Sequence, residues 1–207
     1  MLFIEVLAPP GLLDTGGRAD LAGRLSARNL LGGSADGPGS TDPGVLDLFA
    51  SLSHVVIREP EAWFADGVPV TAVDGPRFVV RVYAGAWAKE MADHLVTAIT
   101  RALADVAGDR VYAEPRAVVH VIGVADGGYG VYGVPHRPAD LLERIESART
   151  REPGQAPAGT FVDPVCGAVV VAGEAVTVEL DGTAYGFCCA GCRGRYVKRH
   201  RAQAPSS

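Results

Sequence analysis

Residues 78–106, FVVRVYAGAWAKEMADHLVTAITRALADV, decide the fold of this 207-residue chain. The run from Phe78 to Tyr83 is typical of a strand. Between Trp87 and Val106, apolar residues recur at spacings of three and four while charged residues lie outside that stripe, which predicts an amphipathic helix. A further strand is expected at residues 118–124. The apolar stripe consists of Met91, Leu95, Ile99, Ala102, Leu103 and Val106.

The earlier part of the chain repeats this order of elements. Strands are expected at residues 2–7 and 53–57, with a helix at residues 18–31 between them. His54 and His120 are 66 residues apart, and so are two Gly-Val-Pro segments that begin at Gly67 and Gly133. The opening strands are 75 residues apart, so an insertion of 9 residues in the first copy is expected. The stretch 32–44, rich in Gly, Ser, Asp and Pro, is its expected site and is interpreted as a flexible surface loop.

This repeat predicts two tandem βαβ units. Their parallel strands and crossover helices indicate an α+β fold, in which one four-stranded sheet carries two helices on one face. A short amphipathic helix near residues 138–150 and a linker then lead to a small Cys-rich unit of hairpins and one helix. The expected domains are residues 1–146, a linker at 147–160, the Cys-rich module at 161–201 and a disordered tail at 202–207.

All four cysteines of the chain lie in this C-terminal module. Cys166 precedes a glycine, so a tight turn there can present its sulfur. Cys188 and Cys192 stand at i and i+4, and Cys189 and Cys192 at i and i+3, which places each pair on one face of a helix. Thiolates are strong ligands for soft metals, so three or four of these sulfurs are expected to converge on one ion.

Two other interpretations of the cysteines stay open. A disulfide framework would allow three pairings and requires an oxidising compartment. Buried inert thiols explain one cysteine better than three at ligand spacing. The basic run after Cys192 is interpreted as cations that offset thiolate charge and suit a helix C-terminus, in preference to a nucleic-acid patch. It comprises Arg193, Arg195, Lys198, Arg199, His200 and Arg201.

Composition and charge narrow the classes of function. A net charge of −5 argues against a general nucleic-acid-binding protein. The first residues lack a basic region and contain Glu5 and Pro9-Pro10, so they do not resemble a signal peptide. No apolar run of the sequence is long enough to span a bilayer. A cytoplasmic protein without membrane or nucleic-acid partners is therefore expected, and thiols there stay reduced and available to metals.

The cysteine pattern resembles the YHS domain, a TRASH-type metal-binding module. The resemblance lies in Pro164-Val165-Cys166-Gly167 and in Tyr185-x-Phe187-Cys188-Cys189-x-x-Cys192, with 21 residues between Cys166 and Cys188. It covers roughly residues 160–201 and implies binding of zinc, copper or mercury, with zinc or copper as the expected cofactor. The ligands implied are Cys166, Cys188 and Cys192, with Cys189, His200 or an exogenous group as the fourth.

The double βαβ arrangement is similar to the tautomerase superfamily, in which such units occur as separate subunits or fused in pairs, as in the macrophage migration inhibitory factor branch. The second copy, from Pro76-x-Phe78 to Gly-Tyr-Gly-Val-Tyr-Gly at 128–133, carries the closer likeness and resembles 4-oxalocrotonate tautomerase in the order of its elements. That family uses an amino-terminal proline whose amine acts as a base. Leu2 follows Met1 here, and the nitrogen of Pro76 is an amide inside the chain, so we expect no catalytic residue.

Histidines and chain edges give further expectations. His54 and His120 occupy equivalent strand positions, where an interior or interface imidazole bonded to backbone is expected. The Gly- and Tyr-rich segments after these strands are expected to pair strands between subunits, because exposed sheet edges must be protected. The resemblance to tautomerases implies a homotrimer.

The sequence therefore predicts a protein that binds or handles a thiophilic transition metal through a Cys-rich module on an oligomeric, catalytically incomplete scaffold. One alternative is an isomerase or tautomerase that acts on a small keto or enol compound and uses a base other than an amino-terminal amine. A second alternative is a metal-responsive regulatory or interaction protein, although no DNA-binding helix-turn-helix is recognisable in the sequence.

Overall fold

The computed structural model describes residues 2–33, 37–113, 116–152 and 156–203. The chain divides into two compact units. The first comprises Met1–Leu30 and Leu52–Tyr129, and the second comprises Leu31–Ser51 and Gly130–Ser207. Each unit contains buried apolar side chains of its own.

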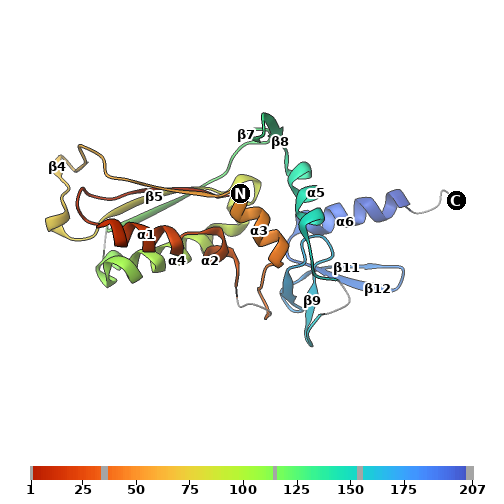
Figure 1. The fold of residues 1–207 in the computed structure, drawn as a ribbon. Coiled ribbons are helices and arrows are strands. Elements are labelled where there is room, and N and C mark those ends of the chain that lie inside the picture. The colour runs from red at the N-terminus through yellow and green to blue at the C-terminus, as the bar shows by residue number, and fades with distance from the viewer. Residues whose placement is uncertain (1, 34–36, 114–115, 153–155, 204–207) are drawn as a thin grey trace. The chain divides into compact units, whose positions relative to one another are not determined.

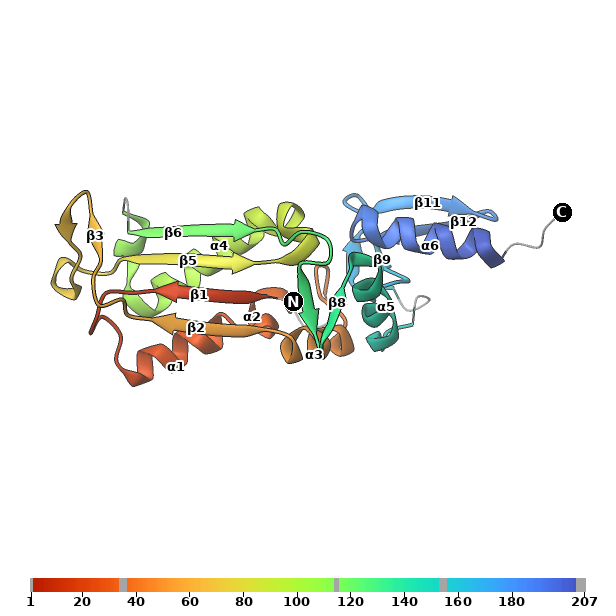
Figure 2. The same ribbon diagram turned by 90° about the horizontal axis from the view of Figure 1, so that it is seen from above.

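A mixed four-stranded sheet in the order β2-β1-β5-β6 forms the scaffold of the first unit (Figure 2). β1 is parallel to β2 and β5 is parallel to β6, whereas β1 and β5 are antiparallel. The sheet therefore consists of two βαβ halves joined along β1 and β5, which confirms the predicted fold. The strands are β1 (Phe3–Leu7), β2 (His54–Arg58), β5 (Phe78–Tyr83) and β6 (Ala117–Ile122).

Helices α1 and α4 cover one face of this sheet (Figure 1). β1 and β5 alternate buried and half-buried side chains, so one face of each strand enters the core. Leu95, Ile99 and Leu103 of α4 are fully buried against that face. In the described part of the chain, no helix is long and apolar enough to cross a membrane. The helices are α1 (Thr15–Arg24), α2 (Ala27–Leu31) and α4 (Ala88–Ala107), with 3-10 turns at Ala72–Asp74, Gly85–Trp87 and Asp109–Tyr112.

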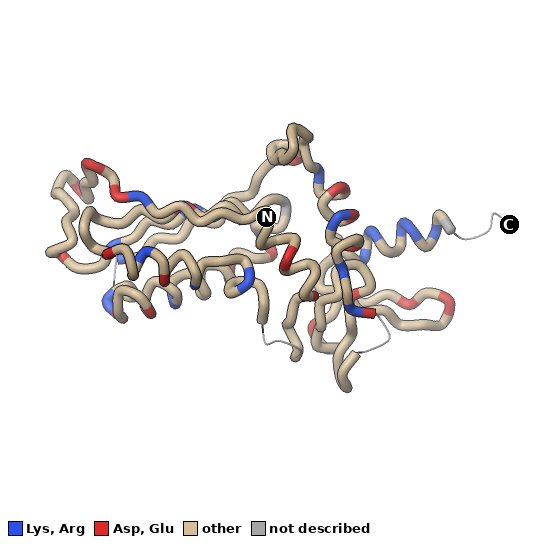
Figure 3. Tube along the Cα trace, viewed as in Figure 1, with Lys and Arg blue, Asp and Glu red and all other residues tan. Residues whose placement is uncertain are grey.

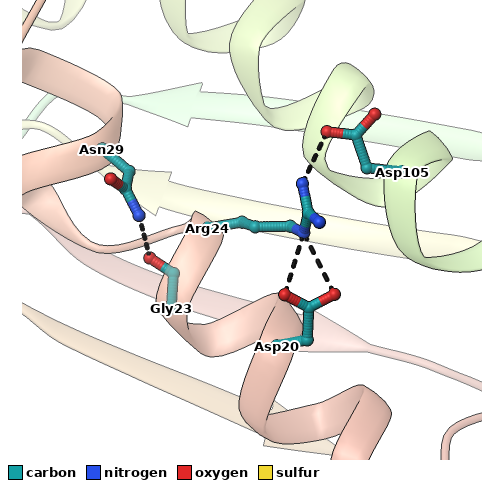
Figure 4. Close-up of polar contacts among 5 residues, drawn as sticks. All are labelled: Asp20, Gly23, Arg24, Asn29 and Asp105. Atoms are coloured by element: carbon teal, nitrogen blue, oxygen red, sulfur yellow. Dashed lines mark hydrogen bonds and ion pairs between the residues drawn. The ribbon is translucent and has the colours of Figure 1, made fainter.

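Arg24 connects the two covering helices and marks the end of α1. Its guanidinium donates from Nη1 to Asp105 of α4 at 2.8 Å and from Nε to Asp20 at 3.0 Å (Figure 4). The side-chain amide of Asn29 donates to the carbonyl of Gly23 at 2.7 Å, which satisfies a carbonyl at the helix end. The single helix predicted at residues 18–31 is divided at this point into α1 and α2.

Two short hairpins occupy equivalent positions of the repeat. Their turn residues have positive φ, with 50° at Asp66 and 74° at Gly67 in one, and 55° at Tyr132 and 74° at Gly133 in the other. Two consecutive residues of this conformation are typical of a type I′ hairpin turn. The hairpins are formed by β3 (Phe64–Ala65) with β4 (Val68–Pro69) and by β7 (Tyr129–Val131) with β8 (Val134–His136).

Besides most of the β7–β8 hairpin, the second unit combines helices with two small antiparallel sheets, β9 with β10 and β11 with β12. Tyr196 of α6 packs against Tyr185 and Phe187 of β12, with ring centroids 5.0 Å and 5.5 Å apart. Phe187 is fully buried, so the module has an apolar centre. The elements are α3 (Pro43–Ser51), α5 (Pro138–Ala148), β9 (Thr160–Val162), β10 (Val169–Val171), β11 (Val176–Leu180), β12 (Thr183–Phe187) and α6 (Ala190–Gln203).

Residues 31–51 belong to this second unit, although they interrupt the first copy of the repeat. The amide of Gly39 donates to the carbonyl of Val169 at 2.8 Å, and the amide of Val169 donates to the carbonyl of Ser40 at 3.0 Å. These bonds add residues 39–40 to the edge of β10. The expected flexible loop is therefore ordered by pairing with the Cys-rich module at these residues, while residues 34–36 lie outside the described part.

The compact second unit is larger than the module expected at residues 161–201, because it includes α3 and α5. In the expected linker, the amides of Thr150 and Arg151 donate to Asp42 at 3.0 Å and 2.7 Å. Residues 153–155 of that linker lie outside the described part. At the other end, α6 continues to Gln203, so residues 202–203 of the expected tail are helical and the rest is not described.

Candidate metal centre

Asp163 organises the loop that carries the first cysteine. Its carboxylate Oδ1 accepts from the amides of Val165 at 2.8 Å and Cys166 at 3.2 Å. Oδ2 accepts from the amide of Cys188 at 2.9 Å, at the end of β12. The Asp163 side chain is fully buried. One carboxylate therefore holds together the two segments that supply the sulfurs.

The three cysteines at ligand spacing meet at this point. The Sγ atoms of Cys166 and Cys188 are 3.5 Å apart, and those of Cys188 and Cys192 are 3.7 Å apart. Together with a carboxylate oxygen of Asp163, the three Sγ atoms all lie within 4.8 Å of one another. Cys166 and Cys192 are buried, whereas Cys188 is exposed. The expected convergence of sulfurs from two separated segments is thus present.

The sulfur spacing suits a tetrahedral metal ion. With Zn–S bonds of about 2.3 Å, two thiolates on one tetrahedral zinc stand about 3.8 Å apart. The Cys166–Cys188 and Cys188–Cys192 sulfur distances are slightly shorter, 3.5 Å and 3.7 Å. The donor set of three thiols with a nearby carboxylate also suits zinc or copper better than magnesium or calcium. The residues present therefore fit a thiophilic ion.

Cys189 has a different position from the other three sulfurs. It directly precedes α6, and its Sγ accepts from the amide of Cys192 at 3.5 Å, as an N-cap side chain does. The four-atom group of potential ligands does not include it. Cys189 is half-buried. The structure therefore presents this sulfur as a cap of the helix beside the cluster.

The thiols perturb one another through their hydrogen bonds. Bonds from the thiols of Cys188 and Cys192 hold the pKa of Cys166 well below its ordinary value. The same two thiols, with the amides of Cys192 and Gly191, lower the pKa of Cys189. Hydrogen bonds with the neighbouring thiols, first that of Cys166, raise the pKa of Cys188. The cluster thus favours thiolates that share the protons of their neighbours, and a metal ion would replace those protons.

Burial has the opposite effect on Asp163. Removal of the carboxylate from water, and secondly the negative charge of Cys166, raise its pKa to about 6, although the amides of Cys188 and Val165 partly oppose this. The carboxylate accepts backbone hydrogen bonds that fix the loop. Asp163 therefore contributes to the site by holding the cysteine segments in position.

Gly167 is required directly after the first cysteine. Its φ is +69°, and a Cβ there would lie 2.6 Å from Oδ2 of Asp42 and 2.9 Å from Cγ of Arg149. Any other residue would strain the backbone and displace these side chains. The cysteine turn can therefore lie against residues 42 and 149 only because this position has no side chain.

Lys and Arg residues recur along α6 (Figure 3), and some of the basic side chains form ion pairs. Arg195 and Arg199 both form ion pairs with Glu146 of α5, the first at 3.0 Å. His200, expected as a possible fourth ligand, lies 3.2 Å from the carboxylate of Asp181 and is not in the four-atom ligand group. Two of the helix cations therefore connect α6 to α5.

The histidines, Arg18 and Pro76 of the first unit lie at separate places on the sheet and its surface. His54 and His120 are both exposed on the sheet, so neither imidazole is interior, and an interface role stays a prediction. Arg18 pairs with Glu59 at 2.5 Å on the surface. Pro76 is buried ahead of β5. These side chains do not form a common site among the described residues.

Sequence reasoning missed Asp163 and Asp42 as functional positions. Asp163 accepts hydrogen bonds from the amides two and three residues later, those of Val165 and Cys166. Asp side chains commonly form such local bonds in turns, so the sequence alone could have indicated this role. The bond from Cys188 to Asp163 depends on tertiary structure. Local sequence could therefore indicate the turn but not its connection to β12.

Comparisons with known proteins concern the fold. No protein-family model and no curated protein sequence matches the chain. A solved structure of Pt0534 inactivated by 2-oxo-3-pentynoate is 16% identical, over 66% of this chain and 98% of that one, with a TM-score of 0.47. Native fused 4-OT is 19% identical, over 64% and 94%, with a TM-score of 0.45. MIF2 of Leishmania major is 18% identical, over 66% and 97%, with a TM-score of 0.43.

Another similar structure is a fused 4-OT described as an asymmetric trimer, with 14% identity over 64% of this chain and 94% of that one and a TM-score of 0.46. At such identities and scores, nothing about the activity or assembly of this chain follows from the likeness. The two-βαβ fold instead rests on the strand order and directions of its own sheet.

Proposed function

We propose that the C-terminal module binds and handles a thiophilic transition metal ion, with Cys166, Cys188 and Cys192 as its protein ligands. The single observation that carries this proposal is the convergence of the three Sγ atoms and a carboxylate oxygen within 4.8 Å. The resemblance of the cysteine pattern to YHS and TRASH-type modules agrees with it. Zinc and copper are the ions whose ligand preferences fit the set best.

The arrangement of the other groups supports an open fourth position. Both carboxylate oxygens of Asp163 already accept backbone amides, so we assign it the role of holding the loop. Cys189 caps α6. Because Cys188 is exposed, water or a donor from another molecule can approach the ion on that side. An open position is typical of sites that exchange ligands, whereas closed four-ligand sites are typical of structural zinc.

The metal would contribute to the stability of a small unit. Few residues of the module are deeply buried apolar ones, with Val162, Val165, Val169 and Phe187 as the main members. Structural zinc in comparable small domains contributes on the order of 10 kcal/mol to folding. Removal of the ion is therefore expected to loosen the cysteine segments.

We infer that the sheet unit serves as an oligomeric scaffold, with a homotrimer as the favoured assembly. Helices cover one face of the sheet (Figure 1), and the opposite face carries half-buried apolar side chains such as Phe3 and Ile122. The hairpin side chains Phe64 and Val68 are 59% and 65% exposed. Exposed apolar positions of this kind on a sheet are commonly covered by another subunit. Sedimentation velocity tests this, since a chain that stays monomeric at micromolar concentration would contradict it.

Elemental analysis of the purified full-length protein tests the metal site. We expect about one zinc or copper ion per chain after saturation and dialysis, and substantial loss of it in Cys188→Ser and Cys192→Ser. The matched control is Cys189→Ser, because serine retains a cap for α6 while one thiol is removed in each variant. Far-ultraviolet circular dichroism verifies that the variants are folded.

Two results would overturn the assignment. Metal content equal to wild type in both ligand variants would exclude Cys188 and Cys192. A loss in Cys189→Ser as large as in the ligand variants would instead place Cys189 in the site.

A further inference from the structure

We propose that Cys189 and Cys192 form a thiol–disulfide site that reacts with low-molecular-weight disulfides, and that its oxidation removes a ligand from the metal. The second part rests on the proposed metal binding, as does the choice of Cys189 over the exposed Cys188 as the entry point, whereas the pairing of Cys189 with Cys192 does not. The observation behind both is that one sulfur of the cluster, Cys189, lies outside the ligand group yet contacts a ligand residue.

Cys189-Ala190-Gly191-Cys192 has the Cys-x-x-Cys spacing at the start of a 14-residue helix. The amide of Cys192 donates to Sγ of Cys189 at 3.5 Å. This contact places Sγ of Cys189 beside the residue that carries the second thiol.

Exposure assigns the two cysteines different roles. Cys189 is half-buried and therefore reachable from solvent, whereas Cys192 is only 3% exposed. With an ion bound, Cys166, Cys188 and Cys192 would be engaged, and Cys189 would remain a free thiol. Cys189 is thus the entry point for a small disulfide, and Cys192 is the resolving thiol.

Backbone geometry permits a disulfide between Cys189 and Cys192 and disfavours one between the adjacent residues Cys188 and Cys189. Residues three apart at the start of a helix have Cα atoms about 5 Å apart, inside the range for disulfides of roughly 4.4–6.8 Å. Adjacent residues such as Cys188 and Cys189 have Cα atoms about 3.8 Å apart across a trans peptide, which lies below that range. A pair of Cys189 with Cys192 therefore closes with little movement of the backbone.

The reaction balances with a glutathione-type disulfide, RSSR, as the oxidant. The Cys189 thiolate attacks one sulfur of RSSR, which forms a mixed disulfide and releases one thiolate that takes up a proton. The Cys192 thiolate then attacks Sγ of Cys189, forms the internal disulfide and releases the second RS⁻. Two cysteines are oxidised, and RSSR is reduced to two RSH. Because Cys192 would no longer offer a thiolate, only Cys166 and Cys188 would remain to hold an ion.

The test exposes the full-length protein, both apo and zinc-loaded, to oxidised glutathione. Chymotryptic cleavage after Phe187 separates Cys166 from the peptide with the other three cysteines, so mass spectrometry detects an internal disulfide in that peptide. A colorimetric zinc indicator follows release of the ion. We expect wild type to form this disulfide and release zinc roughly tenfold or more faster than Cys189→Ser.

Distinct results separate the two parts of the proposal. An internal disulfide in Cys188→Ser apoprotein, absent from Cys189→Ser, supports the pair even if no metal binds, in which case only the metal site fails. A disulfide between Cys166 and Cys188 in wild type, or equal rates of zinc release from wild type and Cys189→Ser, would overturn it.

Discussion

Asp42→Ala is expected to destabilise the second unit strongly, because this one buried carboxylate accepts hydrogen bonds from the backbone amides of two separate segments. Asp42 is fully buried. Its carboxylate accepts from the amides of Gly44 at 2.9 Å and Val45 at 3.3 Å, which caps α3. It also accepts from the amides of Thr150 at 3.0 Å and Arg151 at 2.7 Å, just after α5.

The magnitude follows from these four donors. Loss of an N-cap acceptor costs about 1 kcal/mol, and each further buried amide left without a partner costs roughly 1–3 kcal/mol. The expected loss in unfolding free energy for Asp42→Ala is therefore about 4 kcal/mol. Asp42→Asn retains one acceptor oxygen and is expected to lose about half of that.

Hydrogen–deuterium exchange and urea unfolding measure the effect. Amides of α3 and of residues 150–151 should lose protection, while those of β1 and β5 in the other unit should not. Asp20→Ala is the control, since its carboxylate is half-exposed in a surface ion pair with Arg24. A loss of less than about 1 kcal/mol in Asp42→Ala would refute the capping argument.

The Asp42 carboxylate should make the unfolding free energy of the second unit depend on pH. Burial alone would raise the pKa of Asp42, but the amides of Arg151, Thr150 and Val45 outweigh it and hold the pKa below its ordinary value of 3.8. The folded form therefore binds protons less readily than the unfolded form, so this contribution is present above about pH 4 and is lost as the pH falls below it. The difference in unfolding free energy between wild type and Asp42→Asn should shrink below about pH 4, and a constant difference would contradict this.

Three further substitutions test packing. In Gly44→Ala, the new Cβ would lie 2.0 Å from the carbonyl oxygen of Ala148, so α3 and α5 must separate, and thermal unfolding should show a loss of about 1–3 kcal/mol. Gly186→Ala places a Cβ 2.3 Å from the ring of Phe161 and should lower both stability and, through the nearby cysteines, zinc affinity measured by competition with a chelator. Leu103→Ala removes a fully buried side chain of α4 and should cost about 2–5 kcal/mol in the first unit, with unchanged zinc content as the discriminating readout.

Much of the sheet unit was predictable because its signals are local and periodic. The apolar stripe predicted a helix at residues 87–106, and α4 spans Ala88–Ala107. The recurring Gly-Val-Pro segments predicted equivalent positions of the repeat, and both segments lie in hairpins with positive φ at Gly67 and Gly133. Here the local sequence and the tertiary structure favour the same conformation.

The second unit was less predictable because its partners are distant in sequence. Asp42-Pro43 is an N-cap followed by a proline at the first helical position, yet the glycines and serines before it indicated a loop. The pairing of Gly39 and Ser40 with Val169 joins residues about 130 positions apart and leaves no periodic trace. Similarly, the spacing of Cys166, Cys188 and Cys192 predicted their meeting, whereas the cap role of Cys189 required the course of α6.

The insertion at residues 31–51 limits how the cysteine unit could be moved between proteins. Residues 39–40 of this insertion pair with β10, and Asp42 supplies a buried carboxylate to the second unit. A gene fragment that begins near residue 156 would therefore encode all four cysteines but lack Ser40 and Asp42. Transplantation of such a fragment would leave the amide and the carbonyl of Val169 without their partners at Ser40 and Gly39. The second unit is thus encoded by two segments of the chain, residues 31–51 and 130–207. Recombination between these segments would separate the cysteines from residues that stabilise their surroundings.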